Sequence, residues 1–254
     1  MILAIIQARM SSTRLPGKVL RPILGRPMLL HQIERVRRSK LIDSICVATS
    51  DDPSDDQLVS TLAKDGVAYF RGALNDVLDR FYRAAIGKAP EHVVRLTGDC
   101  PLADPAVIDD LIRLHLSGGF DYSSNCLKYT FPDGLDAEIM AFAALEHAWK
   151  NARLPSEREH VTPYIFKRPE LFHLGSLELS HDYSTLRVTV DEAADFKLVT
   201  KVFEALYPAN PAFGMQDIVV YLDQNPDVKK LNASIKPNEG YLKSLEKDLK
   251  VNRT

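Results

Sequence analysis

The sequence predicts a three-layer α/β fold with a mostly parallel central sheet. Two observations support this prediction. Short, continuously apolar runs, which are typical of strands buried on both faces, recur along the first half of the chain. Between them lie longer segments whose apolar residues are spaced as on one face of a helix. Because strands that alternate with helices are joined by crossovers, we expect a parallel sheet with helices on both sides.

The first half of the chain is predicted to hold four strands and four helices. The strands are expected at residues 2–7, 44–50, 67–70 and 92–97. The helices are expected to begin at Pro27, at Pro53, after Asn75 as N-cap, and at Pro105 after Asp104 as N-cap. In such sheets ligands bind at the carboxyl ends of the strands, where we expect three charged loops to meet: 8–18, 50–52 and 98–104.

The second half is less regular. Strands are expected at 137–142 and 184–190, and helices at 143–152 and after Asp191. We interpret residues 1–232 as a single domain and residues 233–254 as a charged helical tail with a frayed end.

Composition excludes several classes of protein. The net charge of −2 argues against a general nucleic-acid binder. No stretch approaches the ~20 apolar residues needed to span a membrane. The three cysteines form no C-x-x-C pair, which argues against a disulfide framework or a zinc site. We interpret Cys46, Cys100 and Cys126 as reduced thiols of a cytoplasmic protein.

The segment IIQARMSSTRLPGKVL, residues 5–20, places a basic loop after the first predicted strand. It is not a Walker loop, because Ser12 replaces the first glycine of that motif and Val19 follows Lys18. Small residues let backbone N–H groups approach an anion, and cations neutralise it. Three cations suit a triphosphate, with a solvated basic turn as the alternative; the cations and small residues are Arg9, Arg14, Lys18, Ser11, Ser12, Thr13 and Gly17.

Two acidic residues are candidate metal ligands. Asp99 follows Gly98 in RLTGDCPLADP, just past a buried strand, and Mg²⁺ prefers carboxylate oxygens. The alternative is a turn aspartate that bonds its own backbone. In TLRVTVDEAADF, strand alternation places Arg187 and Asp191 on one face. Asp191 could also be the N-cap of the next helix, and the two roles are compatible.

These three motifs, in this order and spacing, resemble the acylneuraminate cytidylyltransferase family, in particular its spore coat polysaccharide biosynthesis protein F-like branch. The segments RGALNDVLDRF, YTFPDGLDAE and PSEREHVTPYI also match that branch. The resemblance covers roughly residues 1–222. It implies a Rossmann-like nucleotidyltransferase fold and a homodimer. It also implies a Mg²⁺-dependent enzyme that transfers CMP from CTP to an acidic sugar or similar acidic acceptor, for surface polysaccharide or flagellar glycan biosynthesis.

The resemblance also implies roles for individual residues. Arg14 and Lys18 would stabilise the leaving pyrophosphate, while Asp99 and Asp191 would hold Mg²⁺ against the α-phosphate. The expected nucleotide-binding residues are Ala8, Arg9, Ser12, Thr13, Gly17, Arg71, Asp76 and Gly98. Two departures from the family pattern are Ser11, where glycine is commoner, and Glu192-Ala193-Ala194 in place of Thr-Pro-Glu.

Base and acceptor recognition are assigned by position. Ala8, Arg71 and Asp76 are the candidates for cytosine, because the loops after the first and third strands border the nucleotide pocket in this family; for Asp76 the alternative is helix capping. Asp136 and Glu138 would share one face of a strand and could bind sugar hydroxyls of the acceptor or a metal, or could simply form a polar face. The remaining acceptor candidates are Arg158, His160 and Arg187, and a dimer partner is the alternative for the first two.

Two local structures in this region have non-catalytic interpretations. Ser156 and Glu159 fit a capping box, and Thr162-Pro163 fits a helix start.

Two other functions stay open: a glycosyltransferase that uses a nucleotide sugar, and a non-catalytic nucleotide-binding subunit. A glycosyltransferase would release no pyrophosphate from CTP, which separates it from a cytidylyltransferase.

Overall fold

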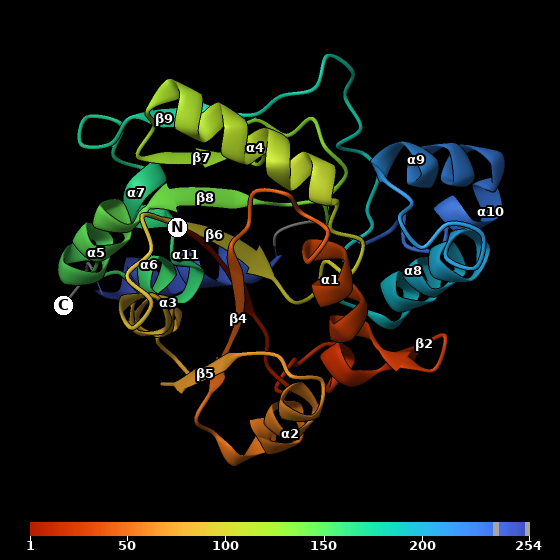
Figure 1. Cartoon of the computed structure of the whole chain (residues 1–254), viewed down its shortest axis with the longest axis horizontal. Coiled ribbons are helices and arrows are strands. Elements are labelled where there is room, and N and C mark those ends of the chain that lie inside the picture. The colour runs from red at the N-terminus through yellow and green to blue at the C-terminus, as the bar shows by residue number, and fades with distance from the viewer. Residues whose placement is uncertain (236–238, 252–254) are drawn as a thin grey trace.

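The computed structural model describes residues 1–235 and 239–251 of the 254-residue chain (Figure 1). Its central sheet has the strand order β5-β4-β1-β6-β8-β7-β9. β1, β4, β5 and β6 pair in parallel, whereas β8 runs antiparallel to both β6 and β7. The strands are β1 Ile2–Gln7, β4 Ser44–Ser50, β5 Tyr69–Gly72, β6 His92–Thr97, β7 Tyr122–Ser124, β8 Glu138–Ala141 and β9 Leu174–Ser176, with a separate hairpin of β2 Pro22–Ile23 and β3 Arg26–Pro27.

Helices cover both faces of this sheet, as the sequence predicts. The apolar residues of β1 alternate: Ala4 and Ile6 pack with α1, α2 and α4, whereas Leu3 and Ile5 pack with α3 and α5. The helices are α1 Met28–Val36, α2 Asp56–Lys64, α3 Val77–Ile86, α4 Pro105–Gly118, α5 Phe142–Asn151, α6 Pro155–His160, α7 Pro163–Phe166, α8 Ala193–Leu206, α9 Met215–Gln224, α10 Pro226–Lys229 and α11 Glu239–Val251, with short 3-10 turns η1 Lys18–Leu20 and η2 Pro53–Asp55.

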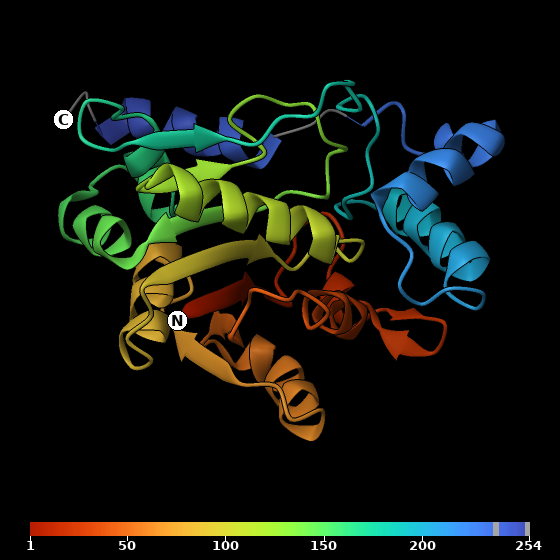
Figure 2. The same ribbon diagram turned by 45° about the horizontal axis from the view of Figure 1, so that its top comes forward.

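A third apolar cluster lies beside the sheet rather than on it. Leu15 of the basic loop, Val188 and Val190 pack there against α8 and α9. Figures 1 and 2 show α8, α9 and α10 gathered at one end of the molecule, away from α5. This arrangement brings the second half of the chain to the edge of the sheet where the basic loop emerges.

Several predicted boundaries are confirmed, and others differ by one to three residues. The strands predicted at 2–7, 44–50 and 92–97 are present with those bounds. The third strand is Tyr69–Gly72 rather than 67–70, because Val67 N–H still bonds to Leu62 O and completes the turn that ends α2. The N-cap of α3 is Asp76, not Asn75, since the Asp76 carboxylate accepts from Asp79 N.

The strand predicted at 184–190 is absent from the described part of the chain. A single bridge joins Asp133 and Arg187, and the N–H groups of Val188 and Val190 bond to Asp133 O at 2.7 Å and to Asp99 O at 2.8 Å. The segment is therefore extended, but two loops take its hydrogen bonds instead of a neighbouring strand. Val188 and Val190 are still buried on one side of it, as the alternation predicts.

The C-terminal helix is present and packs against α6. Asp248 accepts from Ser156 N at 2.9 Å, and Ser244 donates to Glu159 Oε2 at 2.7 Å. The predicted Ser156–Glu159 capping box is wrong, because Glu157 accepts from the backbone N–H groups at the start of α6 instead. The end of the predicted tail, residues 252–254, lies outside the described residues, and the division at residue 232 stays a prediction.

All three cysteines are free, as predicted. Within residues 1–235 and 239–251, no helix has both the length and the apolar character needed to cross a bilayer.

Candidate active site

The carboxyl ends of β1 and β6 approach each other closely at the edge of the sheet. Gly98 N donates to Gln7 O at 2.8 Å. A Cβ atom on Gly98 would lie 2.9 Å from Ala8 Cβ and 2.9 Å from Gln7 O, closer than side-chain atoms tolerate. Gly98 therefore has to lack a side chain for the loops 8–18 and 98–104 to meet, and their meeting agrees with the sequence prediction.

Backbone hydrogen bonds fold the basic loop back on itself. Met10 O accepts from Ser12 N at 2.9 Å and from Gly17 N at 3.0 Å, and Gly17 has a φ of +69°. The buried Asp55 accepts from Met10 N at 2.7 Å, while its second oxygen accepts from Ser50 N at the end of β4. Asp55, which the sequence analysis did not single out, thus fixes the loop to the sheet.

The loop borders a cavity of about 290 Å³, called here the smaller cavity. Eight of the predicted site residues line this cavity. Gly17 does not line it, but its backbone conformation sets the shape of the loop. The lining residues are Gln7, Ala8, Arg9, Ser11, Ser12, Thr13, Arg14, Lys18, Val19, Arg80, Thr97, Gly98, Asp99 and Glu159.

The ammonium group of Lys18 lies between the two predicted metal ligands. It donates to Asp99 Oδ2 at 3.2 Å, to Asp191 Oδ1 at 3.0 Å and to Val190 O at 2.7 Å, and the residue is only 8% exposed. Burial alone would lower the pKa of Lys18, but the two carboxylates outweigh it and raise the pKa. Burial likewise opposes ionisation of Asp99, and Lys18 overcomes it and lowers the pKa of Asp99. Lys18 and Asp99 are therefore both charged at neutral pH.

Asp191 connects this cluster to Arg187. Its Oδ1 pairs with Arg14 at 2.9 Å, and its Oδ2 pairs with Arg187 at 2.9 Å. Arg187 also pairs with Asp133 at 2.7 Å and with Asp195 at 3.0 Å. The predicted N-cap role of Asp191 is wrong: Glu192 is the N-cap of α8, and Asp195 accepts from the N–H groups of both residues. The Asp191 carboxylate therefore does not cap the helix and pairs with the cations of the site instead.

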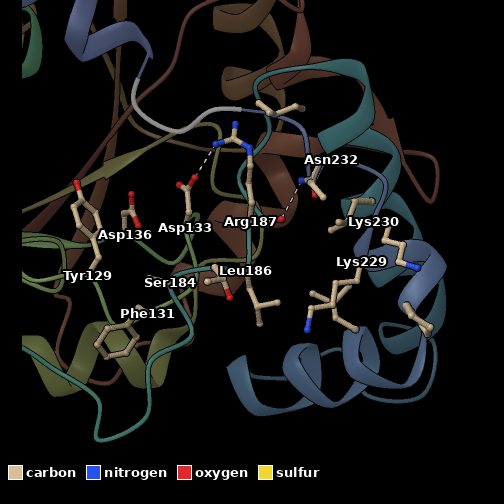
Figure 3. Close-up of a pocket in the computed structure, with 16 residues that line it drawn as sticks. Tyr129, Phe131, Asp133, Asp136, Ser184, Leu186, Arg187, Lys229, Lys230 and Asn232 are labelled. Atoms are coloured by element: carbon tan, nitrogen blue, oxygen red, sulfur yellow. Dashed lines mark hydrogen bonds and ion pairs between the residues drawn. The ribbon is translucent and has the colours of Figure 1, made fainter.

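Arg187 also lines a second cavity of about 650 Å³, called here the larger cavity (Figure 3). Tyr129, Asp133 and Asp136 lie on one side of it and Asn232, Lys229 and Lys230 on the other. Burial raises the pKa of Asp136 to about 7, and the neighbouring Asp133 adds to the effect. The remaining lining residues are Phe131, Ser184, Thr185, Leu186, Leu198, Leu222, Pro226, Ala233 and Ile235.

The structure does not bring the other predicted acceptor residues to either cavity. Glu138 is buried: it accepts from Tyr122 and Thr162 and pairs with Arg95. Asp136 precedes β8, which begins at Glu138, so the expected shared strand face does not exist.

Arg158 and His160 are engaged elsewhere. Arg158 donates to Asp76 at 2.5 Å and to Trp149 O at 2.9 Å. His160 contacts Ser244 of α11 at 3.0 Å, and burial lowers the pKa of His160 to about 4. Neither side chain is among those that line the two cavities.

Arg71 in β5 and Asp76 after it, both predicted to contact cytosine, also lie outside the lining of the two cavities. Arg71 donates to Ser50 O, Asp52 O and Asp56, which ties β5 to the end of β4. Asp76 caps α3 and pairs with Arg158. Arg80, which the sequence analysis did not single out, lines the smaller cavity instead.

The carboxylates of the smaller cavity fit a metal ion that binds together with phosphate. Among the described residues, no group of three or more His, Cys, Asp or Glu side chains could hold a metal alone. Asp99 and Asp191 nevertheless converge on one point, which the Lys18 ammonium occupies. Mg²⁺ commonly takes one or two protein carboxylates and completes its shell with phosphate oxygens and water. The donor set therefore fits Mg²⁺ bound with a nucleotide.

Comparisons with known proteins agree with this geometry. The family model described as cytidylyltransferase matches residues 3–232. Spore coat polysaccharide biosynthesis protein SpsF of Bacillus subtilis is 35% identical over 89% of this chain and 95% of its own length. A 3-deoxy-manno-octulosonate cytidylyltransferase of Anaeromyxobacter dehalogenans is 31% identical over 65% of this chain and 73% of its own.

A solved structure extends the agreement to the whole fold. The structure of a cytidylyltransferase from Leptospira borgpetersenii superimposes with a TM-score of 0.87 and 34% identity, covering 92% of this chain and 98% of that one. The resemblance and the nucleotidyltransferase fold predicted from the sequence are thus confirmed. The chain belongs to the cytidylyltransferase family.

Proposed function

We propose that the protein transfers CMP from CTP to an acidic sugar or similar acidic acceptor and releases pyrophosphate, as a step in surface polysaccharide or flagellar glycan biosynthesis. Membership of the cytidylyltransferase family supports CMP transfer, and the SpsF relative supports the polysaccharide context. The observation that carries the proposal is the single ion-pair cluster of Arg14, Lys18, Asp99 and Asp191 at the smaller cavity.

The reaction needs positive charge where the phosphates lie. An acceptor oxygen attacks the α-phosphorus of CTP, the bond to the β-phosphate oxygen breaks, and pyrophosphate leaves with its negative charge. Arg14 and Lys18 come from the loop that borders the smaller cavity, where they exchange their carboxylate partners for phosphate oxygens. Bound Mg²⁺, held by Asp99 and Asp191, would supply further neutralisation of the phosphates.

The larger cavity is the proposed acceptor site. Arg187 lines it and contacts Asp191, so an acceptor bound there lies one side chain away from the proposed phosphate site. Its acidic lining would repel an acidic acceptor if every carboxylate were ionised. Because the pKa of Asp136 is raised to about 7, this side chain can be protonated and donate a hydrogen bond to an acceptor oxygen. Lys229 and Lys230 add positive charge on the opposite side.

Pyrophosphate release tests the function. The purified protein is incubated with CTP, Mg²⁺ and a panel of acidic sugars, with UTP and GTP as controls. We expect release only with CTP and a matching acceptor. Lys18→Ala and Asp99→Asn should each lower turnover by at least ~100-fold, as when one electrostatic donor is lost. Lys64→Ala, an exposed lysine on α2, is the matched control.

Two results would contradict the proposal. If either variant kept near wild-type turnover, the role assigned to the replaced residue would be wrong. Failure of the wild-type protein to bind CTP would exclude the function itself, and CMP or sugar transfer from a nucleotide sugar without pyrophosphate would favour a glycosyltransferase. The homodimer implied by the family resemblance stays a prediction, which light scattering can test.

A further inference from the structure

One wall of the smaller cavity depends on the C-terminal helix. Glu159 of α6 lines this cavity. Its Oε2 atom accepts from Ser244 Oγ at 2.7 Å and from Lys247 Nζ at 3.3 Å, both of which belong to α11. The cytidylyltransferase family model ends at residue 232, before α11 begins at Glu239. A helix outside the family match therefore holds a residue of the candidate active site.

Ser244 connects Glu159 to His160. Burial lowers the pKa of His160 to about 4, so its ring is neutral at pH 7. The Nε2 atom of His160 lies 3.0 Å from Ser244 Oγ. A serine hydroxyl that donates to a carboxylate can accept a bond from this nitrogen when Nε2 carries the ring hydrogen. His160 thus helps Ser244 to hold the carboxylate of Glu159 on the side of α11.

The helix is docked through polar side chains. Ser244 and Asp248 are buried against α6, where Asp248 accepts from the backbone N–H of Ser156 at 2.9 Å. Leu242 and Leu249, by contrast, are 56% and 60% exposed. Polar contacts at a surface contribute little net stability because water competes for them, whereas buried leucines contribute much more. We therefore expect α11 to detach from α6 more readily than a helix that buries its leucines.

The carboxylate of Glu159 affects any anion that enters the cavity. Burial opposes its ionisation, but Ser244 and Lys247 outweigh burial and lower the pKa of Glu159. An ionised carboxylate beside a triphosphate repels it. In the docked helix, Lys247 neutralises this charge, and both α11 contacts keep it on the oxygen nearest α11. Detachment of α11 would leave the charge of Glu159 at the cavity without these partners.

Resting on the proposed function, we propose that α11 controls nucleotide affinity through Glu159, so that the docked helix gives the high-affinity state. Ser244 and Lys247 are positioning residues, because neither is among the residues that line the cavity. Coupling between two binding events is reciprocal, so CTP must in turn strengthen the docking of α11. The C-terminal helix is thereby a regulatory element that any partner or modification which displaces it would use to weaken CTP binding.

Calorimetry on the full chain with Mg²⁺ at low ionic strength tests the role of Lys247. Lys247→Met should bind CTP about 5- to 10-fold more weakly than the wild type, the low end of usual coupling, because both side chains of the pair are partly exposed. Lys247→Arg should restore the affinity, and the loss should be smaller for CMP, which carries fewer negative charges. Lys243→Met, an exposed lysine of the same helix, is the matched control.

A double-mutant cycle tests whether the effect passes through Glu159. In a Glu159→Gln background, Lys247→Met should change the affinity for CTP by less than about 2-fold, since the charge that Lys247 neutralises is gone. An equal loss of affinity in both backgrounds would overturn the proposal, because Lys247 would then act on the nucleotide by another route. So would a Lys247→Met variant that binds CTP as tightly as the wild type.

Hydrogen exchange measures the reciprocal effect on the wild-type chain. Saturating CTP should slow the exchange of the α11 amides that are protected only in the docked helix, by at least the factor that Lys247→Met loses in affinity. Exchange of α11 that CTP does not change would overturn the coupling, whatever the variants do. Absence of CTP binding by the wild type would instead refute the proposed function.

Discussion

Replacement of Lys18 by methionine separates the structural role of this residue from its proposed catalytic role. Methionine keeps the length and removes the charge, so Asp99 and Asp191 lose the cation they share. Removing one partner of a fully buried pair costs about 3–5 kcal/mol, whereas an exposed pair contributes about 0–1 kcal/mol. The Asp99 and Asp191 side chains are 28% and 20% exposed, and Arg14 and Arg187 still neutralise Asp191.

The expected loss of stability in Lys18→Met lies between the values for a fully buried pair and an exposed pair. We expect the free energy of unfolding to fall by about 2–3 kcal/mol, which lowers Tm by about 4–12 °C for a domain of this size. The pKa of Asp99 is lowered in the fold, so its contribution is present above the unfolded value of about 3.9 and is lost as pH falls below it. The pKa of Lys18 is raised, so its contribution is lost only as pH rises above about 10.4. The difference should therefore be constant between about pH 5 and pH 9.

Thermal unfolding at pH 7.5, with and without Mg²⁺, measures this effect. Mg²⁺ should raise the Tm of Lys18→Met more than that of the wild type, because the ammonium no longer competes for the two carboxylates. Lys64→Met on the exposed face of α2 is the control and should behave as the wild type. A Lys18→Met variant with an unchanged Tm and an unchanged response to Mg²⁺ would refute the ion-pair reasoning.

Three further substitutions probe the walls of the site. Gly98→Ala should cost about 1–3 kcal/mol and weaken CTP binding, because its Cβ would lie 2.9 Å from Gln7 O; Tm and calorimetry measure both effects. Asp55→Asn should lower the free energy of unfolding by about 2 kcal/mol and also weaken CTP binding. The two carboxylate oxygens of Asp55 accept from Met10 N and Ser50 N, whereas an amide has only one oxygen and cannot accept both bonds in this way. The folded-state pKa of Asp136 is raised to about 7, so the wild type loses stability as pH rises from 4 to 7; the Tm of Asp136→Asn relative to wild type should therefore increase between pH 5 and pH 8.

The sequence predicts the basic loop and the two facing carboxylates well, because their positions follow from local patterns. Each follows a buried apolar segment, and parallel topology then places the loops after β1 and β6 side by side. The chemistry of phosphate transfer requires cations and carboxylates together, which singles out Lys18, Asp99 and Asp191 among many charged residues.

Several predicted site residues lie outside the two cavities because of contacts between residues far apart in the chain. Arg158 and Asp76 are 82 positions apart and pair with each other, and His160 is covered by Ser244 of α11, 84 positions away. No local pattern reports such pairings. Arg71 lies outside the cavity for a different reason. It is on the edge strand β5, and its guanidinium group donates to backbone carbonyls at and after the end of β4.

The sequence pattern indicates that Arg80 is buried. It lies three residues after Val77 and four before Ala84, both buried, so the helical period places it on the apolar face of α3. An arginine at such a position must find a buried partner or a ligand. The same signal identifies Arg35, buried on α1, whose guanidinium group donates to the carbonyls of Ala103, Leu102 and Phe213. Arg35 has one buried nitrogen, Nη1, without a hydrogen-bond partner among the described residues, as Arg80 has Nε, so an unpaired donor alone does not distinguish a structural arginine from one that binds a ligand.

The charge balance of the site explains why a nucleotide and a metal ion belong together there. Among the described residues, the ion pairs of this cluster connect four carboxylates, those of Asp99, Asp133, Asp191 and Asp195, with three cations, those of Arg14, Lys18 and Arg187. Without ligand it already carries an excess of negative charge. If the cations turn toward a triphosphate, the carboxylates they leave behind would repel both one another and the phosphates. On the proposed function we therefore expect a divalent cation to enter with the nucleotide, and we expect Asp99 and Asp191 to accept it.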